Sequence, residues 1–158
     1  MKLRYLEFLR AGWGAVLLAA PRAVLTEMRG VQVDRKAIVV TRILGGRQLV
    51  QAMLSGVRPS PEILAAGVWV DGVHALTAFG LALGDRHRAR IGLADGLVAA
   101  LWAGLCWHNL RTGKTPPVAH ARRRDQLARI VIGALPGGGR LMAAASRARV
   151  AGRMPPRR

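Results

Sequence analysis

Four apolar segments, each close to the length of a bilayer-spanning helix, fill the first two thirds of the chain. They run over about residues 9–25, 37–55, 62–83 and 91–110. A transmembrane helix needs roughly 20 mostly apolar residues, whereas strands are much shorter and alternate in polarity. Helix breakers separate the segments, most clearly the run Pro59-Ser60-Pro61. We therefore expect an all-α fold, a polytopic membrane helical bundle of about four helices.

A soluble bundle is the main alternative, and the polar content of the third and fourth segments argues against it. From residue 63 to 83 the ionisable groups are Asp71 and His74, and from residue 91 to 110 they are Asp95 and His108. A helix on the surface of a soluble protein carries a polar stripe over about half of its circumference. These two segments have no such stripe, which favours burial in lipid.

The first segment gives the weakest membrane signal. Pro21-Arg22 interrupts it, so whether it spans or lies in the interface stays open. A cleavable signal peptide is less favoured, because Glu7 lies in the would-be basic region and Leu18 and Ala20 make a poor cleavage site.

Charge divides the chain at residue 110. The protein of 158 residues has a formal net charge of +17, and residues 111–158 hold 12 of the 25 basic residues but a single acid, Asp125. We expect a membrane domain over residues 1–110 and a basic cytoplasmic tail over 111–158, with a short amphipathic helix at about 124–135. Lysines and arginines near segment ends favour cytoplasmic termini. The predicted location is the bacterial inner membrane.

The tail predicts contact with an anionic surface through four arginines: Arg122, Arg123, Arg124 and Arg129. Basic amphipathic helices commonly lie on membranes with anionic lipids. Nucleic acid is a less favoured partner, since no aromatic residue follows Trp107 to stack on bases. The expected partners are lipid headgroups and a partner membrane subunit.

Charged residues within the apolar segments are the candidate site. A charge at bilayer depth is costly and usually pairs inside the bundle. Arg47 and Asp71 each lie 12 residues from the centre of the loop near Pro59, which predicts an ion pair across that hairpin. A second pair, between Arg42 and Asp95, is predicted from their approximate depth.

Neighbouring polar residues could complete this site. Gln48 and Gln51 flank Arg47 and could satisfy its hydrogen bonds. His74 lies three residues after Asp71 on the same helical face, which makes it a candidate proton-responsive group. Small residues line these faces and allow close helix packing. Buried polar clamps are the favoured interpretation, with a proton-responsive or ligand site as the alternative.

The pattern Arg42-x-x-Gly45-x-Arg47-Gln48-Leu49, followed by Asp71-x-x-His74-Ala75, resembles uncharacterised small four-helix integral membrane proteins of actinobacteria. The likeness covers roughly residues 37–110. It implies a four-helix membrane bundle and assigns no reaction.

No motif predicts catalytic residues, a metal site or a cofactor. Gly113-Lys114-Thr115 lacks the earlier glycine of a phosphate-binding loop. The four histidines are scattered, and Cys106 lies in an apolar setting typical of an inert thiol. We therefore expect a non-enzymatic structural or accessory membrane component. The alternatives are a basic peripheral or nucleic-acid-binding protein, and a small transporter or membrane enzyme that uses Asp71 and His74.

Overall fold

The computed structural model describes residues 5–27, 33–86, 89–112 and 123–152, and these residues form helices and short connections without any strand. The predicted all-α class is confirmed. The helices are α1 (Leu6–Ala19), α2 (Pro21–Glu27), α3 (Arg35–Ser55), α4 (Pro61–Gly84), α5 (Ala89–Arg111), α6 (Arg123–Gly133) and α7 (Gly138–Ala151).

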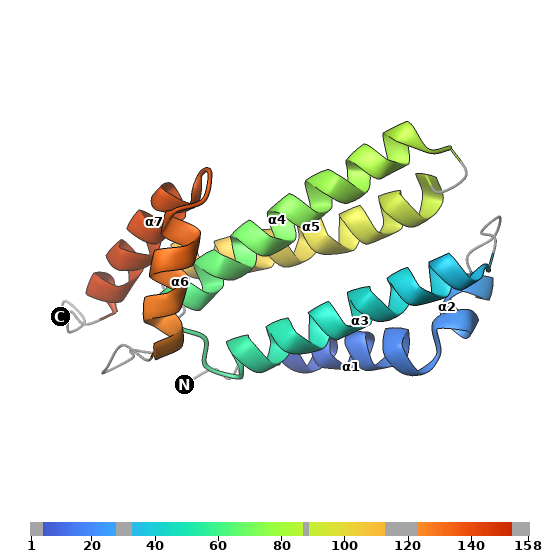
Figure 1. The fold of residues 1–158 in the computed structure, drawn as a ribbon. Helices are drawn as coiled ribbons and strands as arrows, with labels where there is room; N and C mark the ends of the chain where they lie inside the picture. The colour runs from blue at the N-terminus through green and yellow to red at the C-terminus, as the bar shows by residue number, and fades with distance from the viewer. Residues whose placement is uncertain (1–4, 28–32, 87–88, 113–122, 153–158) are drawn as a thin grey trace.

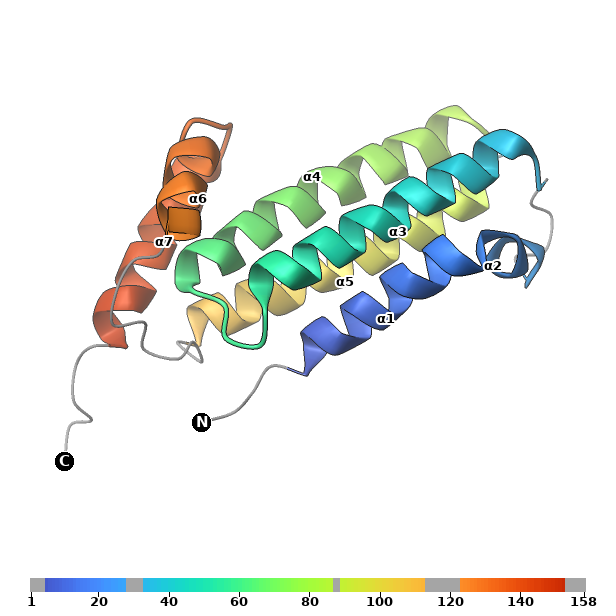
Figure 2. The same cartoon turned by 60° about the horizontal axis from the view of Figure 1, so that its bottom comes forward.

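Two helical hairpins form the body of the protein. Helix α1 packs along α3, and α4 packs along α5, so the four long axes run side by side with alternating direction (Figures 1 and 2). The beginning of α1 and the pair α6–α7 lie at one end of the body, and α2 and the α4–α5 connection lie at the other. We call these the tail end and the far end.

The helix that holds the predicted acid, α4, begins with strong local signals. The Ser60 hydroxyl accepts a hydrogen bond from the backbone N–H of Ile63 at 3.3 Å, and Pro61 occupies the first turn. Such a side-chain cap satisfies a backbone donor that has no partner within the helix, and proline fits the first turn because its missing N–H is not needed there. The start of α4 is thereby fixed, which sets the depth of every later residue on it.

The first predicted segment is broken. Helix α1 ends at Ala19, and Pro21 starts α2 at an angle of 96° to it. Fourteen residues of α-helix extend about 21 Å, less than the roughly 30 Å of a bilayer core. The expected single helix over residues 9–25 is therefore wrong, and Pro21 is the physical reason because it cannot continue the helix through Ala20.

Within the described residues, two helices are long and apolar enough to cross a membrane, α4 and α5. The α1–α2 pair would be a third candidate span only if the bent pair is counted as one. Helix α3 has the length, 21 residues, but does not meet the same hydropathy requirement. The structure is thus consistent with a membrane protein of two candidate spans, fewer than the four that the sequence predicts.

Glycines allow close contact within each hairpin. A Cβ atom added at Gly45 of α3 would lie 2.8 Å from the carbonyl oxygen of Gly14 in α1. In the other hairpin, a Cβ at Gly92 would lie 2.7 Å from the carbonyl oxygen of Ala78. Small residues at such crossings let backbones approach closely, which is the usual basis of packing between membrane helices.

The outer faces of α4 and α5 carry large apolar side chains. Leu76 and Leu83 are 72% and 89% exposed, and Leu97 and Leu101 are 64% and 60% exposed. Large apolar side chains exposed in number usually mark a surface that contacts another protein or a membrane. These leucines fit a surface that faces lipid.

The tail helices pack onto the body. Helices α6 and α7 lie across the N-terminal half of α4 at the tail end (Figure 1). One apolar core joins α7 to the body, with Leu64 and Ala65 of α4, Cys106 and Leu110 of α5, and Ala145 of α7. The predicted division at residue 110 therefore separates elements that share one core. The amphipathic helix expected at 124–135 corresponds to α6.

Candidate functional site

A buried carboxylate lies at the centre of the body. Asp71, about halfway along α4, is 0% exposed. Its Oδ2 accepts a hydrogen bond from Arg10 Nη2 at 2.6 Å. Its Oδ1 accepts hydrogen bonds from Arg47 Nη2 at 2.6 Å and from Gln51 Nε2 at 3.1 Å. Both oxygens of the acid are therefore engaged by donors from α1 and α3.

Arg10 connects this carboxylate to a fourth helix. Its side chain is 1% exposed, and its guanidinium lies over the Trp102 ring of α5 at 4.7 Å. A desolvated guanidinium over an indole face gains a cation–π interaction. We call Arg10, Arg47, Gln51, Asp71 and Trp102 the Asp71 cluster. It joins α1, α3, α4 and α5 at one point.

The structure brings together Arg47 and Asp71, which were predicted to pair because they lie equally far from the loop near Pro59. Gln51, a predicted supporting residue on the same helix, also binds Asp71. Gln48, the other predicted supporting residue, is 2% exposed, but its Oε1 atom has no hydrogen-bond partner within the described residues. Arg10 was missed by the sequence reasoning. The only indication in the sequence was an arginine within the helix that became α1. The distance between α1 and α4 along the chain does not predict which of their residues lie at the same depth.

The predicted pairing of Arg42 with Asp95 is wrong, because each residue has a different environment. His74 Nε2 lies 2.6 Å from Asp95 Oδ2, so the acid on α5 pairs with the histidine on α4. Both side chains are about one fifth exposed. Helix α3 packs beside α1, and α5 packs beside α4, which leaves Arg42 away from Asp95.

Arg42 is exposed at the far end. It lines an open pocket of about 820 Å³ between the α1–α2 bend and the start of α3, together with Arg22 and Arg35. Its exposed side chain lines this pocket and is not part of the Asp71 cluster, so it does not have the intramembrane ion-pair role that the sequence suggested.

A second buried acidic cluster joins the tail helices to α4. Glu62 is 1% exposed, and its Oε1 accepts hydrogen bonds from Arg129 Nε at 3.1 Å and from Arg149 Nε at 2.8 Å. Asp125 is fully buried and accepts from Ser60 Oγ at 2.6 Å and from Arg149 Nη2 at 3.3 Å. We call Ser60, Glu62, Asp125, Arg129 and Arg149 the Glu62 cluster.

Arg149 is the central cation of the Glu62 cluster. Its Nη2 also donates to Glu62 Oε2 at 2.5 Å, so the guanidinium binds both oxygens of that carboxylate. These hydrogen bonds raise the pKa of the Arg149 guanidinium above its ordinary value, because they stabilise the charged form. The sequence did not predict this cluster, because the charge boundary at residue 110 indicates a tail that is separate from the body. The indication in the sequence was a single acid in the basic tail, Asp125, and another, Glu62, at the start of α4.

Of the four tail arginines expected on an anionic surface, two make contacts with the protein instead. Arg124 Nη1 donates to the carbonyl oxygen of Leu54 at 2.6 Å, and Arg129 binds Glu62. Arg123 is exposed at the start of α6. Arg122 lies outside the described residues. The physical reason is that α6 packs against the body, where acceptors are close to its cationic side chains.

The chemistry of the two clusters is that of charge pairing. The oxygens of Asp71 and Glu62 are bound by the protein's own arginines, so neither acid presents an oxygen to an open cavity. Among the described residues, no three His, Cys, Asp or Glu side chains lie close enough together to hold a metal ion. Comparison with protein-family models, with curated proteins and with solved structures found no match for this chain.

Proposed function

We propose that this chain is a small integral protein of a bacterial inner membrane, with a structural or accessory role rather than a catalytic one. The observation that carries the proposal is the Asp71 cluster. A single buried carboxylate holds one arginine from α1 and one from α3, and the α1 arginine rests on a tryptophan of α5. The cluster thus serves as a clamp that fixes how the two hairpins pack.

A clamp of this kind suits a membrane interior. The hydrophobic effect contributes little to the association of helices in lipid, because lipid tails are as apolar as leucine, so close packing and polar contacts must hold the helices together. A buried polar contact is specific, since an unpaired charge in the same place is costly. The Asp71 cluster therefore supports a defined arrangement of α1 and α3 against α4 and α5.

The proposed topology has four crossings, with both termini in the cytoplasm. It is supported by the side-by-side arrangement of α1, α3, α4 and α5, and by the shared position of the start of α1 and of α6–α7 at the tail end (Figures 1 and 2). In this topology Arg47 of α3 faces Asp71 of α4, and Arg42 lines the open pocket at the far end. The resemblance to actinobacterial four-helix membrane proteins agrees with it but stays a prediction.

Carbonate extraction of membranes tests integral insertion. Cells expressing the protein with a C-terminal tag should retain it in the carbonate pellet and release it only with detergent. Recovery in the carbonate supernatant would overturn the membrane proposal. The number of crossings is then tested with single cysteines in a Cys106→Ala background, placed at Tyr5, Val33 and Asp85. With four crossings, membrane-impermeant maleimide should label Val33→Cys and Asp85→Cys in intact cells and Tyr5→Cys only after lysis. If only α4 and α5 cross, Val33→Cys should also be labelled only after lysis.

The accessory role predicts a partner membrane subunit. Crosslinking in membranes followed by purification through the tag should recover a stoichiometric second membrane protein. Recovery of the chain alone, from membranes of its native host at native abundance, would contradict an accessory role in a complex.

The Asp71–His74 transporter or enzyme stays the second candidate. The observation that favours it is the His74–Asp95 pair, whose groups are partly exposed and in which the charge of the contact depends on the histidine proton. It predicts that His74→Asn abolishes an activity while the protein stays folded. Nucleic-acid binding is less favoured, because Arg124, Arg129 and Arg149 are engaged by the protein itself.

A further inference from the structure

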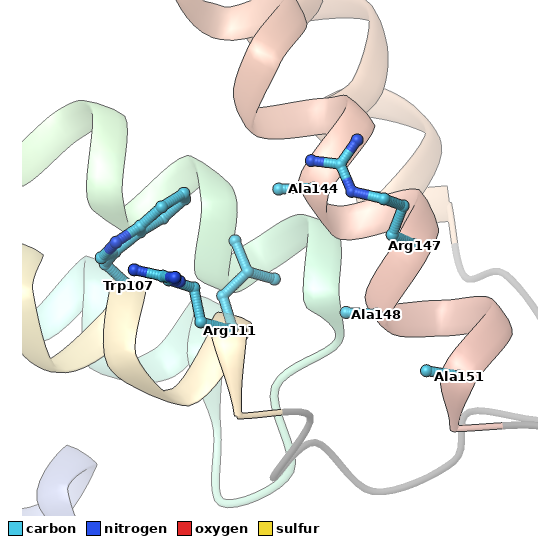
Figure 3. A pocket seen from close by; sticks show the side chains of 7 residues that line it. Trp107, Arg111, Ala144, Arg147, Ala148 and Ala151 are labelled. Atoms are coloured by element: carbon cyan, nitrogen blue, oxygen red, sulfur yellow. The ribbon is translucent and has the colours of Figure 1, made fainter.

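An open groove lies between the last turn of α5 and one face of α7. It has a volume of about 440 Å³, and its lining combines Trp107, Leu110 and Arg111 of α5 with Ala144, Arg147, Ala148 and Ala151 of α7. Figure 3 shows the guanidinium groups of Arg111 and Arg147 on opposite sides of this opening, with the Trp107 ring beside Arg111. We call this the α5–α7 groove.

The two arginines of the groove differ from the other tail-end arginines in their partners. Arg149 and Arg129 bind Glu62, and Arg124 binds a backbone carbonyl. Arg111 and Arg147 are exposed and make no ion pair or hydrogen bond within the part of the chain that the structure describes, apart from the stacking of Arg111 over Trp107 at 5.9 Å. No acid lines the groove. Two positive charges on one opening repel each other, so an anion between them would stabilise the arrangement.

The level of the groove along α5, relative to a membrane that α5 would cross, indicates which anion binds there. Helix α5 is a candidate span, and Trp107 and Arg111 lie in its last two turns. Tryptophan is enriched at the level of lipid headgroups, and arginine near a helix end extends its charge toward the same level. Leu110, Ala144 and Ala148 give the groove an apolar floor beside its charges. A phosphate attached to acyl chains matches this combination, and guanidinium groups are well suited to phosphate oxygens.

We propose that the α5–α7 groove binds the phosphate of an anionic phospholipid headgroup, with Arg111 and Arg147 as its two cationic contacts. The inference rests on the proposed membrane function, because the lipid is the membrane's own. It transfers the lipid-contact role that the sequence gave to Arg124 and Arg129 to a different pair of arginines. It also gives α7 a role in holding lipid against the end of α5.

Quenching of tryptophan fluorescence by brominated lipids tests the site. The full chain, purified in a non-ionic detergent, is titrated with dibrominated phosphatidylglycerol and, separately, with dibrominated phosphatidylcholine. Trp107→Phe identifies the part of the quenching that comes from the groove. The double variant Arg111→Gln with Arg147→Gln removes both cations, and Arg140→Gln is the matched control, since Arg140 is an exposed arginine of α7 that does not line the groove.

The expected result is a component of the quenching by phosphatidylglycerol that is lost in Trp107→Phe. The affinity for this component should fall about 30-fold in the double variant, because each arginine near an anionic surface contributes about 1 kcal/mol, or about fivefold. Arg140→Gln should stay within about twofold of the wild type. The single variants Arg111→Gln and Arg147→Gln should each show an intermediate loss, which guards against a folding defect confined to the double variant. Circular dichroism checks that every variant keeps its helix content.

Three outcomes would overturn the inference. Equal quenching by both lipids, undiminished quenching in Trp107→Phe, or equal weakening by Arg140→Gln would each remove the groove as a specific site. Displacement of the brominated lipid by inorganic phosphate at equal concentration would show a soluble anion to be the ligand and overturn the lipid assignment. Carbonate extraction of the same variants separates the two proposals. A chain that stays in the pellet but fails these tests disproves the groove alone, whereas release into the supernatant disproves the membrane function.

Discussion

Replacing the central acid, Asp71→Asn, should destabilise the protein by about 3–5 kcal/mol, the usual cost of removing one partner of a buried ion pair. The side chain of Arg10 is 1% exposed and would stay charged in a place that water does not reach. Arg47 is 20% exposed, so part of its charge can already be solvated. The loss should therefore come mainly from Arg10.

This difference between the arginines gives a sharper test than the single change. Removing the stranded charge, in Asp71→Asn with Arg10→Gln, should recover about 1–3 kcal/mol, even after loss of the cation–π contact with Trp102, which is worth about 1 kcal/mol. Asp71→Asn with Arg47→Gln should recover about 1 kcal/mol or less, as for a partly exposed pair. The sequence alone would have placed the stronger coupling on Arg47.

Equilibrium unfolding in mixed micelles, with an increasing fraction of sodium dodecyl sulfate and far-ultraviolet circular dichroism as the signal, measures these changes. Asp34→Asn is the matched control. It makes the same chemical change at the exposed start of α3, where Asn caps a helix as well as Asp does. If the free energy of unfolding changes no more for Asp71→Asn than for the control, the clamp is refuted. If the two double variants recover equal stability, the claim that most of the loss comes from Arg10 is refuted.

Two further predictions concern packing and the tail. Gly45→Ala should destabilise the α1–α3 hairpin by about 1–3 kcal/mol, since the new Cβ would lie 2.8 Å from a backbone oxygen of α1, whereas Gly46→Ala, with open space around it, should be neutral or stabilising in the same unfolding assay. Arg149→Gln leaves the buried carboxylate of Glu62 with one guanidinium instead of two, so α7 should become susceptible to limited digestion with trypsin. Arg147→Gln is the control, because Arg147 is exposed. It should leave the digestion pattern of α7 unchanged except at residue 147.

Sequence reasoning found the contact between α3 and α4, two long helices that follow each other in the chain. Counting outward from the loop near Pro59 gave Arg47 and Asp71 the same depth, because two antiparallel helices joined by a short loop must place equal distances from the turn side by side. The same reasoning located α3, α4 and α5 to within two residues at each end. The length of an apolar segment and the positions of helix-breaking residues are local properties, so they can be determined from the sequence alone.

The parts that sequence reasoning missed depend on contacts between elements far apart in the chain. Arg10 meets Asp71 across 61 residues, and Arg149 meets Glu62 across 87. The predicted pairing of Arg42 with Asp95 assumed that α3 and α5 are neighbours. Composition does not reveal which hairpin partner a helix chooses, since the small residues that permit close packing occur on α3, α4 and α5 alike.

The position of the acids explains why the tail end should attract an anionic membrane surface more strongly than the net charge suggests. Four of the eight acids in the chain are buried, and Glu7, Glu62, Asp71 and Asp125 therefore add little negative potential to the surface. The other four lie along α5 or at the far end, where α2, the start of α3 and the α4–α5 connection are found (Figure 1).

The described surface of the tail end is consequently left with arginines and almost no exposed carboxylate to offset them. Cations within a Debye length of an anionic leaflet add their attraction, whereas buried ion pairs contribute nothing to it. Helices α6 and α7 bring Arg123, Arg140 and Arg147 to this end, and α5 adds Arg111. By pairing its acids inside, the protein separates the charges that hold the fold together from those on its exposed surface. The α5–α7 groove is where two of the outward-facing cations share one opening, and a lipid phosphate should be held there more tightly than elsewhere on the surface.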